Sequence, residues 1–333
     1  MLKVSVIMAC HNAERFIGEA IDSVLCQTYK NLELIIVDDA STDNSLAIAR
    51  QASSLDPRIY VYTLDKNVGP GGARNIGVEK ASGEWLAVLD ADDVFVENKL
   101  EKQLERLNGN NSDIVLIGSN SYQIDVSSNI ISEQKYPLTN EKLKNNLVWG
   151  KRFPAHSSIM YRTDIIRFLG AFDNRFSPSE DWDLWLRLIN EGDFTIAPEP
   201  LVKYRNHALN ISKITPEREK YGYAAMICHW LRIWGYSDPS KYTNSKDWDA
   251  FLNWISSKLR EEGIFEYIQT ITIWRNLLKE KLTLTAKCWE AGRMGIMNPR
   301  ISILLIRSKL FHDTLPKKLA KEWIKKSSVL SHT

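Results

Sequence analysis

Carboxylates gather directly after two apolar runs in the first hundred residues. One run ends in Asp38-Asp39, with Asp43 close behind, and another ends in Asp90-Ala91-Asp92-Asp93. In an open α/β sheet, ligands bind beyond the carboxyl ends of the strands, so these two clusters are expected to line one site. Converging carboxylates repel one another, and a hard divalent cation, Mg²⁺ or Mn²⁺, relieves that repulsion. Taken alone, Asp43 could instead cap the next helix.

Two less acidic segments follow other apolar runs. His11-Asn12 comes after the first run, and Gly69-Pro70-Gly71-Gly72-Ala73-Arg74 comes after the third. The glycine segment is not a dinucleotide fingerprint, because Arg74 stands where that motif needs glycine and because the segment follows the third strand. It offers close backbone approach and a helix N-terminus before Arg74, which suit an anionic phosphate. A turn that only begins a helix is the structural alternative.

Two further groups lie downstream. Glu180 and Asp181 stand in the first turn of an expected helix, where acids stabilise the helix dipole. One of them could equally be a general base, and Trp182 or Trp185 could offer a face on which a sugar stacks. His207 could bind a metal ion or lie on the surface.

The first half of the chain shows the alternation of short β-rich runs and amphipathic stretches that is typical of a mostly parallel sheet. Strands are expected at Val4–Cys10, Leu32–Val37, Ile59–Leu64, Trp85–Leu89 and Ile114–Ile117. Helices are expected near residues 16–25, 44–53, 74–81 and 97–107.

Beyond residue 120 the pattern changes twice. A hairpin near residues 126–129, a strand at 158–161 and a helix at 181–190 that ends at Gly192 are expected first. After Ile214 the strand signals fade and the chain becomes helical and rich in tryptophan, a residue that most often packs in a core. We therefore expect an α/β domain over residues 1–212 and an α-helical region over residues 213–333.

Composition and charge exclude several classes of protein. The chain has 333 residues, enough for about two domains, and 43 basic against 41 acidic residues give a net charge of +2, which argues against nucleic acid as a partner. The four cysteines are far apart, which favours a reduced, cytoplasmic compartment. No apolar run is long enough to span a membrane, the longest late one being Ile301–Ile306. A basic tail after Pro299 could be a solvated helix face or could contact anionic lipid.

Taken in this order, the motifs resemble those of inverting family 2 glycosyltransferases, which have the GT-A fold with its Rossmann-like, mostly parallel sheet. The resemblance covers residues 2–212. It includes Val4–Ile7, Asp38–Asp43, Gly71–Asn75, Asp90–Asp93, Glu180-Asp181 and Tyr204–His207. One departure is Ala9-Cys10-His11-Asn12, where the family often has Pro-x-Tyr-Asn.

The resemblance implies a role for each matched residue. A nucleotide-sugar, UDP-linked on family grounds, would be the donor. Asp38 and Asp39 would hold its base or ribose, Asp90 would lie near the ribose and Arg74 near the donor. The full donor-binding set would be Ala9, His11, Asn12, Asp38, Asp39, Gly71, Arg74, Asp90 and Ala91. Asp92 would bind Mn²⁺ or Mg²⁺, with His207 as a further ligand.

The resemblance also implies the reaction. Asp181 would remove the proton from an acceptor hydroxyl as it attacks the anomeric carbon, and this single displacement inverts the configuration. Glu180 beside it would raise the pKa of Asp181 through repulsion. The acceptor would be a glycan or lipid-linked saccharide in surface polysaccharide, O-antigen or capsule synthesis, with the protein in the cytoplasm, peripheral to the inner face of the cell membrane.

Three other functions fit part of the pattern. Asp90-Ala91-Asp92-Asp93-Val94 also satisfies the DxDx(T/V) motif of haloacid dehalogenase-type phosphatases, with Asp90 as nucleophile and Asp92 as acid and base. Against this, the strand before it is not the first, and no GDxxxD loop follows. A nucleotidyltransferase would need a Gly-rich, Arg-bearing first loop where Cys10–Ala13 stands. A catalytically silent sugar-binding module would bind the donor without turnover.

Overall fold

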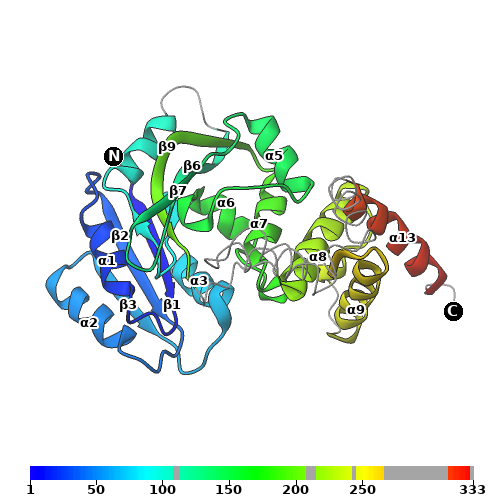
Figure 1. Ribbon diagram of the computed structural model, residues 1–333, viewed down its shortest axis with the longest axis horizontal. Helices are drawn as coiled ribbons and strands as arrows, with labels where there is room; N and C mark the ends of the chain where they lie inside the picture. Colours follow the sequence, from blue (N-terminus) through cyan, green and yellow to red (C-terminus); the bar gives the residue numbers. More distant parts are fainter. Residues whose placement is uncertain (108–112, 208–214, 242–244, 266–313, 331–333) are drawn as a thin grey trace, which may run out of the picture. The chain divides into compact units, whose positions relative to one another are not determined.

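A nine-stranded sheet is formed by strands between Val4 and Arg205 in the computed structural model, which describes residues 1–107, 113–207, 215–241, 245–265 and 314–330. The chain divides into two compact units, residues 1–210 and 211–333. The first unit contains the sheet and the second is helical (Figure 1). The expected helical character of the C-terminal region is therefore confirmed for its described residues.

One half of the sheet is parallel, as predicted. Its order is β3-β2-β1-β4, formed by β1 (Val4–Cys10), β2 (Leu32–Asp38), β3 (Ile59–Thr63) and β4 (Trp85–Val88). Alternate side chains of β1 point to opposite faces: Val6 and Met8 belong to the core with Ile21 of α1 (Ile17–Leu25), whereas Ile7 meets Gly77 of α3 (Gly69–Lys80). Helices thus cover both faces of β1, which explains its continuous apolar run.

The other half of the sheet mixes parallel and antiparallel pairs. It comprises β5 (Val94–Phe95), β6 (Ile114–Ile124), β7 (Ile130–Gln134), β8 (Met160–Arg162) and β9 (Asp193–Arg205). The expected hairpin is confirmed, since β6 and β7 join through a turn closed by the bond from Asp125 N to Asn129 O.

Strand β9 has 13 residues and was not predicted. Pro198 and Pro200 lie within it, and proline lacks the N–H that a ladder requires. The pairing of β6 with β9 shifts register between Ser119 and Ser121, opposite these prolines, and the Asn120 side-chain amide donates to Pro198 O at 2.6 Å. The irregular register accommodates both prolines inside the sheet.

The helices of the first unit begin and end near the predicted places, with one correction. Besides α1 and α3 they are α2 (Ser45–Leu55), α4 (Lys99–Leu104), α5 (Asn140–Val148), α6 (Thr163–Phe168) and α7 (Glu180–Leu188). Helix α3 starts at Gly69 instead of Arg74, so the glycine segment is the first turn of the helix and not a loop before it. Pro70 suits this turn because an N–H there has no intrahelical acceptor.

Gly192 is required by a close approach of two backbones, not as the helix C-cap that the sequence suggested, since α7 ends at Leu188. A Cβ at Gly192 would lie 2.2 Å from Asp113 O. We expect Gly192→Ala to lower the free energy of unfolding by about 1–3 kcal/mol, measured by urea titration. Gly18→Ala in α1 is the matched control: a Cβ there meets nothing within 4 Å, so this variant should be neutral or slightly stabilising. Equal stability of both variants would contradict the packing argument.

The second unit is built from α8 (Pro216–Ile233), α9 (Ser245–Glu261) and α13 (Leu315–Leu330). The ring of Trp323 in α13 lies 4.8 Å from Phe251 and 5.0 Å from Trp254 of α9, so these tryptophans contribute to a core, as expected. Across the described residues, no helix combines the length and the apolar character that crossing a membrane requires. Trp274, Trp289 and the apolar run Ile301–Ile306 lie outside the described residues.

Candidate functional site

The ends of β1 and β2 hold His11, Asn12 and Asp39 against one another. The His11 Nδ1–H donates to Asp39 O at 2.7 Å, and Asn12 Oδ1 accepts from Thr42 N at 2.8 Å. Asn12 and Ala40 have φ angles of 52° and 56°, so both chains turn sharply where the strands end. The parallel pairing of β1 with β2, with Ala9 opposite Val37, brings these two motifs together.

Asp38 and Asp39 are both buried but differ in their partners. Asp39 Oδ1 accepts from Val68 N, the residue before α3, at 2.7 Å. Asp38 Oδ2 accepts from Ser41 N, whereas the buried Asp38 Oδ1 has no hydrogen-bond partner among the described residues. An unpaired buried acceptor is costly. Asp38 therefore has a buried oxygen without a partner among the described residues, and Asp39 fixes the start of α3.

Asp43 has the structural role that the sequence left open. Its Oδ1 accepts from Ser45 N at 2.9 Å at the start of α2, and its Oδ2 accepts from Glu14 N. The bond from Ser45 satisfies an N–H group at the start of α2, and the bond from Glu14 holds the segment before α1, so Asp43 connects the two segments.

The loop after β4 carries three acids with three different environments. Asp90 Oδ1 accepts from Arg74 at 2.7 Å, and Asp92 Oδ2 lies 2.7 Å from His207 Nε2. Asp93 is buried and accepts from the Ser157 hydroxyl at 2.5 Å and from Arg205 N at 2.8 Å. Asp93 thus ties the loop to the fold, while Asp90 and Asp92 remain half-buried.

The pKa values of these three carboxyl groups are shifted in different ways. Burial tends to raise the pKa of Asp90, but the Arg74 charge outweighs it and the net pKa is lowered. The pKa of Asp92 is raised by burial and by the Asp90 charge, against the hydrogen bond from His207. Burial and the two neighbouring acids raise the pKa of Asp93 well above its usual value. The loop therefore has excess negative charge that a cation would neutralise.

Asp92 and His207 are the pair that fits a divalent cation. An imidazole nitrogen and a carboxylate oxygen form a donor set that Mn²⁺ accepts, and the pair already converges within 2.7 Å. No cluster of three or more His, Cys, Asp or Glu that could hold a metal occurs within the described part of the chain.

Arg74 links the β4 loop to the start of α7. Its two terminal nitrogens contact Asp90 Oδ1 at 2.7 Å and Glu180 Oε1 at 2.9 Å, and its side chain is buried. Gly71 does not face open space, since a Cβ there would lie 2.5 Å from Asn174 Oδ1. The expected repulsion of Asp181 by Glu180 is reduced, because Arg74 compensates the charge of Glu180. Asp181, half-buried, accepts from Trp182 N through Oδ1 at 2.7 Å.

The two tryptophans of α7 have different surroundings. Trp185 is 3% exposed, and its indole N–H donates to the Tyr161 hydroxyl at 2.6 Å. Its expected role as a sugar-stacking face is wrong, because packing against Phe153 and His156 leaves it no free face. Trp182 is half-buried, and its indole N–H has no partner among the described residues. Trp182 remains the residue through which α7 could contact a sugar.

Three residues near the acids were assigned no role from the sequence, although one of them, Arg205, lies within the matched segment Tyr204–His207. Ser157 accepts from Asp90 N and donates to Asp93, so it closes the β4 loop. Arg205 is fully buried: it contacts Glu19 at 2.6 Å, donates to Asp92 O at 2.7 Å and lies 4.7 Å from the Phe16 ring. The only sequence signals were the polar run Ala155-His156-Ser157-Ser158 and the position of Arg205 beside His207.

His156, the third of these residues, is buried and is expected to make the stability of the fold depend on pH. Burial, with a smaller effect of the Arg74 charge, lowers its pKa to about 3. A histidine of the unfolded chain takes up a proton below about pH 6.5, so this contribution to stability is complete above pH 6.5 and is lost as the pH falls towards 3. We expect His156→Gln to recover about 2 kcal/mol of the stability that the wild type loses between pH 6.5 and 5, measured by urea unfolding. Parallel pH dependence of the two proteins would contradict this.

The comparisons with known proteins agree with one another. The family model described as glycosyl transferase family 2 matches residues 5–170. An uncharacterized glycosyltransferase of Methanocaldococcus jannaschii, MJ1057, is 34% identical over 232 residues, which are 68% of this chain and 79% of the relative. A second relative is the Escherichia coli UDP-Glc:alpha-D-GlcNAc-diphosphoundecaprenol beta-1,3-glucosyltransferase WfgD, 34% identical over 194 residues, 58% of this chain and 72% of that protein.

A solved structure shares the fold. S. aureus TarS 1-349 in complex with UDP-GlcNAc superposes with a TM-score of 0.58 at 17% identity, over 98% of this chain and 92% of that chain. At this identity the likeness concerns the fold alone.

Proposed function

Because the chain belongs to glycosyl transferase family 2 and has the GT-A fold, we propose that it transfers a hexose from a nucleotide-sugar to a hydroxyl group with inversion. The observation that carries this proposal is the Arg74 bridge, which holds the DxD-type acid Asp90 against the first turn of the helix that bears Asp181. A donor-binding loop and a carboxylate able to accept a proton are thereby kept within one unit of the fold.

In this proposal, several residues bind the nucleotide-sugar donor. Asp38, with its unpaired buried oxygen, and Asp39 hold the base or ribose, with His11 and Asn12 beside them. Ala9, Gly71, Asp90 and Ala91 complete the donor-binding set that the family pattern implies, and Arg74, which that pattern places near the donor, pairs with Asp90. UDP is the proposed carrier, and its support is the UDP-sugar named for WfgD and for the TarS complex.

Asp92 and His207 would hold Mn²⁺ or Mg²⁺, which when bound neutralises negative charge on the departing nucleoside diphosphate. The raised pKa of Asp92, caused first by burial and then by the Asp90 charge, supports a need for a cation at this place. Asp181 accepts the proton of the attacking hydroxyl, and Trp182 offers its indole to the acceptor.

The proposed acceptor is a glycan or a lipid-linked saccharide of surface polysaccharide synthesis, supported by the diphosphoundecaprenol acceptor in the name of WfgD. The haloacid dehalogenase alternative gains no support, because Asp90–Asp93 lies inside the residues that match glycosyl transferase family 2.

A nucleotide-sugar panel with Mn²⁺ or Mg²⁺ and a set of saccharide acceptors tests the proposal. We expect release of the nucleoside diphosphate together with a glycosylated product of inverted configuration. Binding of the donor without turnover would instead identify a sugar-binding module, and hydrolysis of a generic phosphoester without transfer would identify a phosphatase.

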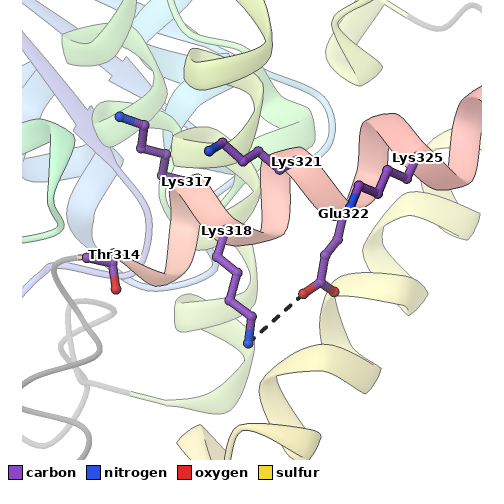
Figure 2. A pocket seen from close by; sticks show the side chains of 6 residues that line it. All are labelled: Thr314, Lys317, Lys318, Lys321, Glu322 and Lys325. Carbon is purple, nitrogen blue, oxygen red and sulfur yellow. Dashed lines mark ion pairs between the residues drawn. The ribbon is translucent and has the colours of Figure 1, made fainter.

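We further propose that the second unit contacts an anionic membrane through α13. Lys317, Lys321 and Lys325 recur every four residues along this helix, and in Figure 2 Lys317 and Lys321 extend away from the side where Lys318 meets Glu322. Lys321 and Lys325 are exposed, whereas Lys317 is half-buried with its Nζ 4.8 Å from the centre of the Trp230 ring. Arg300, Arg307 and Lys309 of the basic tail lie outside the described residues. Each lysine near an anionic leaflet contributes about 1 kcal/mol.

Changing Lys317, Lys321 and Lys325 together to glutamine should therefore lower partitioning onto phosphatidylglycerol vesicles by about 100-fold in a low-salt sedimentation assay. The matched control replaces Lys80, Lys135 and Lys142, exposed lysines of the first unit, by glutamine and should partition like the wild type. Equal partitioning of the two triple variants would refute the contact.

A further inference from the structure

Arg74 stands between two carboxylates that come from distant parts of the chain. Each of its terminal nitrogens contacts one of them: the first contacts Asp90, 16 residues away, and the second contacts Glu180, 106 residues away. A guanidinium presents donors in a rigid planar fork, so it can hold two carboxylates in a fixed relation, whereas the ammonium of a lysine acts as a point charge. The Phe172 ring lies 5.8 Å from the guanidinium carbon.

The backbone around Arg74 is fitted to the segment that leads into α7. Asn75 exchanges two hydrogen bonds with the backbone of Phe172, at 2.8 and 2.9 Å. A Cβ at Gly71 would lie 3.0 Å from Glu180 Cγ, and a Cβ at Gly72 would lie 2.8 Å from Asn174 Nδ2. The two glycines therefore let α3 approach the segment before α7 closely enough for the Arg74 side chain to reach Glu180.

The charges at this point compensate one another only while Arg74 is present. Burial tends to lower the pKa of Arg74, but the charges of Asp90, Glu180 and Asp181 outweigh it, so Arg74 stays protonated. Asp90 and Glu180 each accept a hydrogen bond from Arg74, and the charge of the neighbouring Asp181 also favours the protonated Arg74.

We propose that Arg74 is a positioning residue: it fixes the loop that carries Asp90 against the helix that carries Asp181, and Glu180 is its anchor instead of a second base. This inference rests on the proposed function. In this role Arg74 aligns the proton-accepting Asp181 with the sugar donor, and it does not bind the donor phosphates.

The test compares Arg74→Lys, Glu180→Ala and the double variant, each in the full chain, under the donor and acceptor conditions that give wild-type turnover. We expect each single variant to lower kcat by about 10- to 100-fold, because a displacement near 1 Å is enough to cause such a loss. The KM for the donor and the calorimetric Kd of UDP should stay within about two-fold of the wild type. The double variant should be no more than about three-fold slower than the slower single variant, because both changes break one connection.

The matched control is Arg58→Lys, since Arg58 also pairs with an acid, Asp56, but on the surface of the same unit; its kcat should equal that of the wild type. A ten-fold weaker UDP affinity with unchanged kcat would overturn the inference and make Arg74 a donor ligand. Multiplicative losses in the double variant, or an unchanged kcat, would overturn it as well. If Arg74→Lys does not fold, Glu180→Gln replaces it as the second probe of the connection.

Failure of this inference is distinguishable from failure of the proposed function. If the wild type transfers no sugar from any donor, the proposed function is refuted. If the wild type transfers sugar and the variants show a weaker UDP affinity with unchanged kcat, only the role of Arg74 is refuted.

Discussion

Asp181→Asn is expected to lower kcat by about 10²- to 10⁴-fold while UDP binds as tightly as to the wild type. An amide cannot accept the proton that leaves the acceptor hydroxyl, and loss of a general base has an effect of this size. The asparagine Oδ1 can still accept from Trp182 N, as Asp181 does now at 2.7 Å, so the first turn of α7 should keep its structure.

The measurement is steady-state transfer at saturating donor together with calorimetry of UDP. Asp164→Asn is the control, since Asp164 is an aspartate of the same unit that pairs with Arg162 at the surface; it should retain full kcat. Turnover like that of the wild type in Asp181→Asn would show that the proton goes elsewhere. A lost UDP affinity in that variant would place Asp181 in the donor site.

Asp92→Asn should have the second-largest effect, a loss of about 10²-fold or more in turnover together with loss of the metal dependence of UDP binding. Asp92 and His207 are the two side chains that converge in the described site for a cation. A nucleoside diphosphate brings further negative charge to a loop that already carries Asp90, Asp92 and Asp93, so without a cation the ligand is repelled.

Calorimetry of UDP with and without Mn²⁺ checks this prediction. In the wild type, a chelator should weaken binding and added Mn²⁺ should restore it. Asp92→Asn should bind weakly in both conditions, and His207→Ala should show a smaller loss because one ligand remains. Asp125→Asn is the control, an acid of the β6–β7 turn whose carboxylate accepts from Ser127 N and Asn129 N. Mn²⁺-dependent binding retained by Asp92→Asn would remove this residue from the metal site.

The local sequence pattern was sufficient to predict the strands of the parallel half of the sheet. The apolar runs of β1 to β4 are continuous because both faces are covered, and their approximate positions can be read from the sequence, whereas their order β3-β2-β1-β4 in the sheet comes from the structure. Asp38 ends β2, Asp39 follows it and Asp90–Asp93 follows β4, and the rule that ligands bind at carboxyl ends places these acids at one edge. The hairpin between β6 and β7 follows from local turn residues in the same way.

Strand β9 and the start of α3 were not predictable from local pattern. Two prolines argue against a strand, and β9 is held by its pairing with β6 through a shifted register and with β5. The glycines of α3 have poor helix propensity, but the approach of Asn174 and Glu180 requires residues without a side chain at Gly71 and Gly72. In both cases a contact from more than 70 residues away outweighs the local preference.

Residue types and spacing alone determined which side chains of this protein could do chemistry, because acids, histidine and arginine at the ends of predicted strands can be identified from the sequence. Tertiary structure alone decided what each of them does. Asp43 holds a helix start, Asp93 is bonded to Ser157 and Arg205, and Trp185 is enclosed by aromatic rings. The physical reason is that the role of a charged group depends on its partners and its exposure to water, and these partners come from segments that the sequence does not show to be neighbours.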